Sequence, residues 1–261
     1  MTTTPARKRF GQHFLHDTGV LDRIVQAFAP QPSDHVVEIG PGHGVLTRVL
    51  APQVTRLHAL EIDRDLAAEL DADPLLAKNV TVYNADALSF DYCALVDRDR
   101  KLRVIGNLPY NISTPLLFRL LDQVNCLEDM CFMLQNEVVD RLCAQPNSKA
   151  YGRLGVMVQW RCGVEKLLSV KPAAFRPPPK VDSAVVHLRP HAKPPVTVNT
   201  ETVFAGIVQA AFVQRRKILR NALKDFLNDQ QIRALDIDPM RRGETLTLEE
   251  FAALSNAVER Q

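Results

Sequence analysis

The chain has 261 residues, of which 46% are hydrophobic and 24% are charged, and its formal net charge is only +2. This composition is that of an ordinary globular protein with one large core, or one core and a small second domain. No apolar run is long enough to span a bilayer and the N-terminus carries no secretory signal, so we expect a cytoplasmic protein.

The cysteines and histidines are too scattered for a cross-linked or metal-bound framework. The five cysteines are odd in number and include no C-x-x-C pair, which argues against structural disulfides and against a zinc site. The seven histidines form no H-E-x-x-H or similar cluster, so we expect no metal. We predict buried free thiols at Cys93, Cys126, Cys131, Cys143 and Cys162.

Short apolar strands alternate with helical patterns from about residue 20 to residue 137. Such alternation implies parallel strands joined by right-handed helical crossovers. The sequence therefore predicts an α/β protein with a doubly wound, Rossmann-like sheet, whose ligands bind at the carboxyl ends of the strands. Strands are predicted at 35–40, 57–63, 80–86, 102–107 and 130–137.

The remainder of the chain predicts an edge to this sheet and then a second domain. A helix at 151–163 precedes two strands, 164–172 and 183–190, whose short separation permits an antiparallel pair at the sheet edge. A proline-containing linker follows at 191–199, and the apolar spacing of 203–226 predicts one continuous helix. We therefore expect a first domain at 1–192 and a small all-helical domain at 199–261.

Three successive strand ends carry groups that suit a nucleoside. The stretch "VVEIGPGHG" places Gly40, Gly42 and Gly44 in a turn that lets the backbone pass close to a ligand. The G-x-G-x-G spacing differs from the G-x-G-x-x-G of nicotinamide dehydrogenases, which makes that class the weaker interpretation. Glu61 can accept hydrogen bonds from ribose hydroxyls, and Asp86 can accept one from an adenine amine. Alone, each acid could equally be a helix cap or a surface charge.

Several stretches carry a resemblance to a known family. The glycine-rich turn, the acidic end of the second strand and "NLPY" after the fourth resemble S-adenosylmethionine-dependent adenine methyltransferases. Together, "RKRFGQHFL", "NLPYNISTPLLF", "NSKAYGRL" and "FRPPPKVDSAVV" resemble the ribosomal RNA small-subunit methyltransferase A family, the small-subunit RNA adenine dimethyltransferases. The resemblance runs from about residue 7 to the end of the chain.

This resemblance implies an enzyme that dimethylates two adjacent adenosines in a hairpin loop near the 3′ end of small-subunit ribosomal RNA. It implies S-adenosylmethionine as cofactor, the immature small ribosomal subunit as partner, a monomer and a part in ribosome biogenesis. Where some family members read "FGQNFL", this chain has His13, so a backbone contact is expected there; an ordinary polar residue is the alternative. The implied cofactor pocket consists of His13, Leu15, Gly40, Gly42, Glu61, Asp86 and Asn107.

The tetrapeptide after the fourth strand suits catalysis on an amine. The lone pair of an adenine amine is delocalised into the ring, and the Asn107 side-chain oxygen and the Leu108 carbonyl can accept its two hydrogens. Pro109 orients that carbonyl and Tyr110 can stack on the base. Phe175 would cover the opposite face of the base. The alternative is a strand-terminating turn with Tyr110 in the core.

Two basic clusters suggest a polyanionic partner. One is the arm at Arg7, Lys8 and Arg9. The other, within 213–224, contains five basic residues and no acidic one. On a continuous helix, Lys217, Arg220 and Lys224 form one polar stripe that can contact phosphates. Arg215 falls on the apolar face of that helix, and its guanidinium extends toward the cleft. A solvated helix face is the alternative. The five are Arg215, Arg216, Lys217, Arg220 and Lys224.

Two rival functions stay open at this point. One is a ribosome-assembly binding factor for which methylation is incidental, and the other is a large-subunit RNA adenine methyltransferase. The intact tetrapeptide at 107–110 and Glu61 favour an enzyme. The sequences "NLPYNISTP" and "PPPKVDSA" and the C-terminal helices favour small-subunit RNA as the substrate.

Overall fold

The computed structural model describes residues 12–76, 78–97 and 100–258. Their contacts divide the chain into two compact units. The first unit comprises the described residues of 1–139 and 165–190, and the second those of 140–164 and 191–261. Residues 140–164 thus group with the C-terminal helices, whereas the sequence analysis placed them in a domain ending at residue 192.

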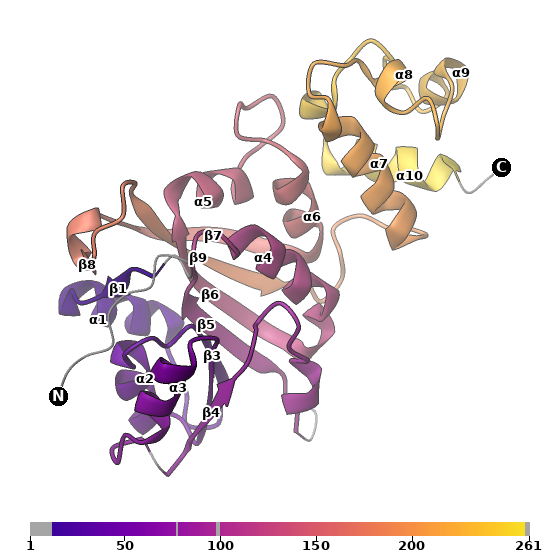
Figure 1. Cartoon of the computed structure of the whole chain (residues 1–261). Coiled ribbons are helices and arrows are strands. Elements are labelled where there is room, and N and C mark those ends of the chain that lie inside the picture. The colour runs from indigo at the N-terminus through magenta and orange to yellow at the C-terminus, as the bar shows by residue number, and fades with distance from the viewer. Residues whose placement is uncertain (1–11, 77, 98–99, 259–261) are drawn as a thin grey trace. The chain divides into compact units, whose positions relative to one another are not determined.

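The first unit is built around one large sheet, shown with its helices in Figure 1. Its strands are β2 (His35–Ile39), β3 (Arg56–Glu61), β4 (Val80–Asn84), β5 (Leu102–Asn107), β6 (Leu127–Gln135), β9 (Ser183–Pro190) and, shared with the second unit, β7 (Cys162–Val170). Its helices include α1 (Thr18–Phe28), α2 (Val45–Leu50), α3 (Arg64–Asp71) and α4 (Ser113–Asp122), and α5 (Asn136–Leu142) begins in it. A separate two-stranded ladder joins β1 (Phe14–Leu15) to β8 (Phe175–Arg176).

The strand order is β4-β3-β2-β5-β6-β9-β7. The pairs from β4 to β6 are parallel, and β9 runs antiparallel to β6, with Met130 opposite Leu188. The predicted doubly wound, Rossmann-like α/β fold is confirmed. Because the chain moves outward from β2 to β4 and then returns to β5 on the other side, the strand order reverses between β2 and β5. Ligand sites of such sheets lie at this switch point.

Helix α1 shows how the sequence builds the core on one face of the sheet. Asp17 caps its first turn by accepting a hydrogen bond from the Val20 N–H at 3.0 Å. The apolar residues Val20, Ile24 and Phe28 recur at helical spacing, and they are buried together with Val36 of β2. Figure 1 shows α1 and α2 on one side of the sheet and α4 on the other.

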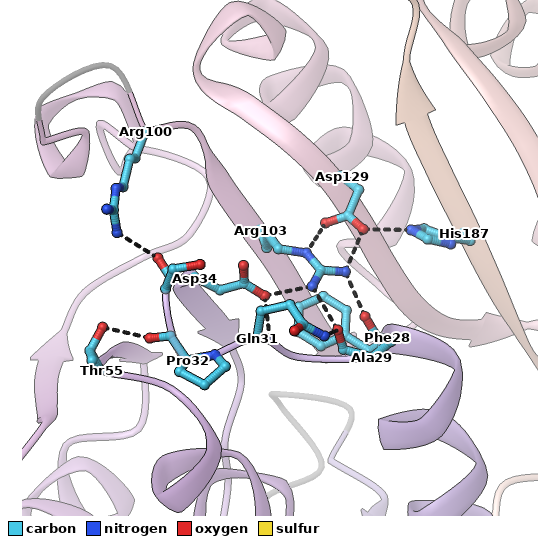
Figure 2. Close-up of polar contacts among 11 residues, drawn as sticks. Phe28, Ala29, Gln31, Pro32, Asp34, Thr55, Arg100, Arg103, Asp129 and His187 are labelled. Carbon is cyan, nitrogen blue, oxygen red and sulfur yellow. Dashed lines mark hydrogen bonds and ion pairs between the residues drawn. The ribbon is translucent and has the colours of Figure 1, made fainter.

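A network of charged residues lies near the amino ends of the parallel strands β5 and β6 (Figure 2). The Arg103 guanidinium donates to the Asp129 carboxylate at 2.8 Å, to Asp34 at 2.6 Å and to the Phe28 carbonyl. Asp129 also contacts the His187 ring nitrogen at 2.7 Å. Because each charge has several partners, the network ties α1, β5, β6 and β9 together without an uncompensated buried ion.

The expectation of five free thiols is corrected at one pair. Cys93 and Cys126 are joined by a disulfide, and their Cα atoms are 5.4 Å apart. They are 33 residues apart in sequence, and the fold brings two short 3₁₀ turns, Cys93–Leu95 and Val124–Cys126, side by side. Spacing along the chain carries no signal for such a pair. Cys131 and Cys162 are buried free thiols, as predicted, whereas Cys143 is only half-buried.

The second unit is helical, with α6 (Arg153–Arg161), α7 (Glu201–Val213), α8 (Leu219–Ala222), α9 (Asp229–Arg233) and α10 (Leu248–Val258). Helix α10 packs on α7, and buried residues of both, such as Phe204 and Phe251, form its core. Among the residues that the structure describes in either unit, no helix is both long and apolar enough to cross a membrane.

The predicted continuous helix at 203–226 is wrong. Helix α7 ends at Val213, and Gln214 leaves helical geometry with φ −127° and ψ 80°. Ile218 is extended, with φ −74° and ψ 159°, and forms a bridge with Arg242. The Leu219 N–H then donates to the Arg241 carbonyl at 2.8 Å. This pairing with a distant segment overrides the local helical spacing.

Candidate active site

The carboxyl ends of β2, β3 and β5 and the segment after β4 surround one cavity in the first unit. Of the residues predicted to bind a cofactor, His13, Gly40, Gly42, Glu61, Asp86 and Asn107 line it. Leu108, Pro109 and Tyr110, predicted to act on the substrate, line it as well. The fold thus gathers at one place groups that are far apart in the sequence.

The glycine turn after β2 needs residues without a side chain. Gly40 and Gly42 have φ values of 68° and 57°, in the left-handed region that disfavours other residues. A Cβ atom on Gly42 would lie 2.9 Å from the Phe14 ring, so the turn and the N-terminal segment are packed closely. The Gly40 N–H donates to the Leu60 carbonyl at 2.9 Å, which fixes the turn against β3.

Glu61 ends β3 and is only 4% exposed. One carboxylate oxygen accepts the Gly42 N–H at 3.1 Å and the other accepts the Asp63 N–H at 2.9 Å. Burial raises the pKa of Glu61, and these two hydrogen bonds oppose that rise. Since each carboxylate oxygen can accept more than one hydrogen bond, Glu61 can still accept ligand hydroxyls.

Asp86 lies two residues beyond β4 and is exposed. One of its oxygens accepts the Leu88 N–H at 2.9 Å. The buried Tyr92 hydroxyl donates to the Ala87 carbonyl at 3.0 Å, and the Tyr92 N–H donates to the Gln123 side chain at 2.8 Å. These bonds hold the segment so that Asp86 forms one wall of the cavity.

Asn107 is the last residue of β5, and its side chain is oriented by the N-terminal segment. Its Nδ2 donates to the His13 carbonyl at 2.8 Å. The next residue, Leu108, is 1% exposed, and its N–H donates to the Met133 carbonyl at 3.1 Å. The pairing of β5 with β6 therefore extends one residue further, and Pro109, which has no N–H, ends it.

Tyr110 is half-buried at the cavity wall. Its hydroxyl lies 2.6 Å from the Ser183 hydroxyl, and its ring stacks on the His13 ring with centroids 5.5 Å apart. Burial raises the pKa of Tyr110, and the bond with Ser183 opposes that rise. Ser183, at the start of β9, was not singled out from the sequence, and no pattern in its neighbourhood indicates this contact.

A second cavity adjoins the first and shares Phe14, Gly40 and Asn107 with it. Leu15, predicted to contact the cofactor, lines this second cavity instead. Glu38, next to the last residue of β2, lines it too and is 2% exposed. In the sequence Glu38 begins the Glu-x-Gly-x-Gly-x-Gly pattern of the turn and is the acid of the strand "HVVEI".

Phe175 lies elsewhere than the sequence analysis expected. It is 2% exposed and belongs to the hydrophobic core of the first unit, and the residues lining the main cavity do not include it. The reason is the ladder between β1 and β8, which pairs Phe175 with Leu15. In this structure its ring packs in the core and not on the wall of the main cavity.

The five basic residues of 213–224 fall into three groups in the second unit. Arg215 forms an ion pair with Glu244 at 3.0 Å and donates to the Lys149 carbonyl at 2.7 Å, so it is held within this unit. Arg220 lies 3.6 Å from Asp229. Arg216, Lys217 and Lys224 are exposed, and the two lysines line one groove. The arm at Arg7, Lys8 and Arg9 lies outside the described residues.

Comparison with known proteins identifies the family. The model of the ribosomal RNA adenine dimethylase family matches residues 3–260. A relative from Nitrosococcus oceani, named ribosomal RNA small subunit methyltransferase A, is 55% identical over 96% of this chain and 95% of its own length. The chain belongs to the ribosomal RNA adenine dimethylase family. It is accordingly a methyltransferase that acts on adenine in ribosomal RNA.

Solved structures of family-like enzymes share the fold. A dimethyladenosine transferase from Plasmodium falciparum has a TM-score of 0.79 at 28% identity, covering 93% of this chain and 96% of its own. The 23S rRNA methyltransferase ErmE has a TM-score of 0.72 at 25% identity, covering 94% of this chain and 99% of its own. Among the described residues, no group of three or more His, Cys, Asp or Glu could hold a metal ion.

Proposed function

We propose that this adenine dimethylase transfers methyl groups from S-adenosylmethionine to the exocyclic amines of two adjacent adenosines. The target is a hairpin loop near the 3′ end of small-subunit ribosomal RNA, on the immature small subunit in the cytoplasm, and the enzyme acts as a monomer. One observation carries the proposal: Asn107, Glu61 and Asp86 line a single cavity at neighbouring strand ends. The small-subunit names of relatives about half identical to this chain support the choice of RNA.

The cavity suits the nucleoside half of S-adenosylmethionine. Glu61 accepts the ribose hydroxyls, and the free oxygen of Asp86 accepts an adenine amine hydrogen. Ile62 and Ala87 supply apolar surface for the ring, and the turn at Gly40 leaves room for the rest of the molecule. S-adenosylmethionine supplies an electrophilic methyl group on a sulfonium centre.

Asn107 and Leu108 prepare the target nitrogen. The Asn107 Oδ1 and the Leu108 carbonyl accept the two amine hydrogens, which favours a pyramidal nitrogen with a localised lone pair. Tyr110 stacks on the base, and such stacking contributes about 1–3 kcal/mol, comparable with the few kcal/mol that extruding a loop nucleotide costs. Catalysis then depends on orientation and on hydrogen bonds that strengthen as charge develops.

The groove of the second unit supports a role in RNA binding. Lys217 and Lys224 lie on it with the half-buried ring of Phe226. Neither lysine forms an ion pair with a residue that the structure describes, so both charges are free to meet phosphates. Arg215 and Arg220, which have acidic partners, contribute less.

The large-subunit alternative rests on one observation, the fold shared with ErmE. Its 25% identity is about half that of the small-subunit relatives, which makes it the weaker candidate. An assembly factor with incidental methylation would not need Asn107 and Tyr110 to line the same cavity, as they do here.

A methyl-transfer assay tests the proposal. Unmodified small subunits and, separately, large-subunit RNA are incubated with labelled S-adenosylmethionine, and dimethyladenosine is mapped. We expect label at two adjacent adenosines of the small-subunit RNA. Asn107→Ala should lose most of the single-turnover rate while RNA affinity is nearly unchanged, since its bonds act in the transition state. Label confined to large-subunit RNA would replace the proposal with the alternative, and near wild-type turnover by the variant would remove Asn107 from catalysis.

A further inference from the structure

The amide of Asn107 has only one orientation compatible with its surroundings. The end of the side chain that faces the N-terminal segment lies 2.8 Å from the His13 carbonyl oxygen. A carbonyl oxygen can only accept a hydrogen bond, so the NH₂ end must face it. The Oδ1 end is therefore turned away from His13, and it accepts no hydrogen bond within the part of the chain that the structure describes.

The His13 carbonyl is itself held firmly in place. The residues after it pair with β8, Phe14 opposite Arg176 and Leu15 opposite Phe175. The His13 Nδ1–H donates to the Pro177 carbonyl at 2.7 Å. The His13 ring also stacks on Tyr110, with an angle of 30° between the rings. Three contacts therefore restrict the position of the His13 carbonyl: the backbone pairing of the next residues, the hydrogen bond of the His13 ring and its stacking on Tyr110.

We propose that the backbone carbonyl of His13 is a positioning group that makes Asn107 present an acceptor, never a donor, to the reacting base. The consequence is a site that recognises an exocyclic amine and repels a keto oxygen at the same position. With the amide reversed, its NH₂ would oppose the target amine, and neither amine hydrogen could be accepted by Asn107. This inference rests on the proposed catalytic role of Asn107 and adds the group that orients it.

Asn107→Asp separates this role from a merely structural one. An aspartate has oxygen at both ends, so one oxygen must face the His13 carbonyl. When ionised, that pair repels; when protonated, the acid donates to the carbonyl and its other oxygen accepts from the amine, as asparagine does. The carbonyl should hold the pKa of the new carboxyl above the ordinary value of about 3.9.

The measurement is the single-turnover methyl-transfer rate of Asn107→Asp relative to wild type between about pH 5.5 and pH 8.5. We expect this ratio to fall with rising pH, by about tenfold per pH unit above the pKa of the new carboxyl. Circular dichroism and cofactor binding at each pH show that the variant is folded. If the carbonyl has no orienting role, the ionised acid is the stronger acceptor, and a ratio that is constant or rises with pH overturns the inference.

A matched control comes from the end of the neighbouring strand. The Asn84 Nδ2 donates to the Glu61 carbonyl at 2.9 Å, the same kind of bond as that of Asn107, and Asn84 does not line the cavity. Asn84→Asp should keep a constant rate ratio to wild type across the pH range. A ratio falling as steeply as for Asn107→Asp would overturn the inference, because any aspartate facing a carbonyl would then produce it.

The outcomes distinguish this inference from the proposed function. Near wild-type turnover by Asn107→Ala refutes the catalytic role itself. An inactive Ala variant with a pH-independent Asp variant leaves that role standing and refutes only the orientation by His13. An Asp variant whose rate stays low at every pH also refutes the orientation, since the protonated acid then fails to replace the amide.

Discussion

Glu38→Gln should remove a penalty that the folded protein carries at neutral pH. Glu38 is 2% exposed, and its Oε2 has no hydrogen-bond partner among the residues that the structure describes. Burial raises the pKa of Glu38 from the ordinary 4.5 to about 7; the nearby Thr47 hydroxyl opposes this rise and the Glu61 carboxylate adds to it. The folded protein therefore keeps a proton on Glu38 that the unfolded chain releases.

The sign and size of the effect follow from that difference. Between about pH 4.5 and pH 7 the folded state binds one more proton than the unfolded chain, so the free energy of unfolding falls as pH rises. Above about pH 7 both states are ionised and this contribution is constant. One pKa unit corresponds to about 1.4 kcal/mol, so the full loss is roughly 3 kcal/mol. Gln has nearly the same shape and no charge to desolvate, so the variant escapes this loss.

Urea-induced unfolding, followed by circular dichroism between about pH 5 and pH 8, measures the effect. The advantage of Glu38→Gln over wild type should grow by roughly 2–3 kcal/mol across this range. Glu128→Gln, at an exposed position of β6, is the control: it measures how the loss of one surface charge changes the free energy of unfolding. An advantage that does not change with pH would refute the buried carboxyl of Glu38 as its source.

Three further predictions concern the cofactor wall, the disulfide and the groove. Glu61→Ala should weaken S-adenosylmethionine binding by about 1.5–3 kcal/mol, and an unchanged dissociation constant by calorimetry in a folded variant would exclude Glu61 from the site. Cys93→Ser should cost up to about 3–4 kcal/mol in urea unfolding, and reductant should abolish the difference; a wild-type mass showing all five cysteines as thiols would contradict the disulfide. Replacing Lys217 and Lys224 by Ala should make the slope of log binding constant against log salt concentration shallower, by roughly 0.7–0.9 per lost phosphate contact. Lys193→Ala should leave this slope unchanged.

The sheet could be predicted from the sequence because its signals are local. The predicted bounds of β5 and β9 agree with the structure. Strand β3 is shorter than predicted because Asp63 accepts the Asp65 N–H at 3.1 Å and so caps α3. A cap and a strand end compete for the same residues, and the sequence shows both signals at once.

The prediction of one continuous helix at 203–226 was wrong for a different reason. Apolar residues at the predicted spacing are still buried beyond the end of α7: Leu219 and Leu223 are both 0% exposed. The turn after Val213 returns the chain to the same core, so the burial pattern persists although the helix does not. Periodicity reports which residues face the core, and it cannot show whether the backbone between two buried residues stays helical.

Some features of the candidate site follow from the local sequence, and others depend on residues far away along the chain. Side chains at successive parallel strand ends must meet at one edge, so Glu61 and Asn107 could be placed together from the sequence. What orients Asn107 comes from His13, 94 residues away, and what holds His13 comes from Pro177, 164 residues away. The tetrapeptide "NLPY" therefore supplies an amide and a carbonyl but does not itself decide which end of the amide meets the base. In the role proposed for His13, its carbonyl in the N-terminal segment makes that choice, so the tetrapeptide would act on an amine together with a backbone group far away in the sequence.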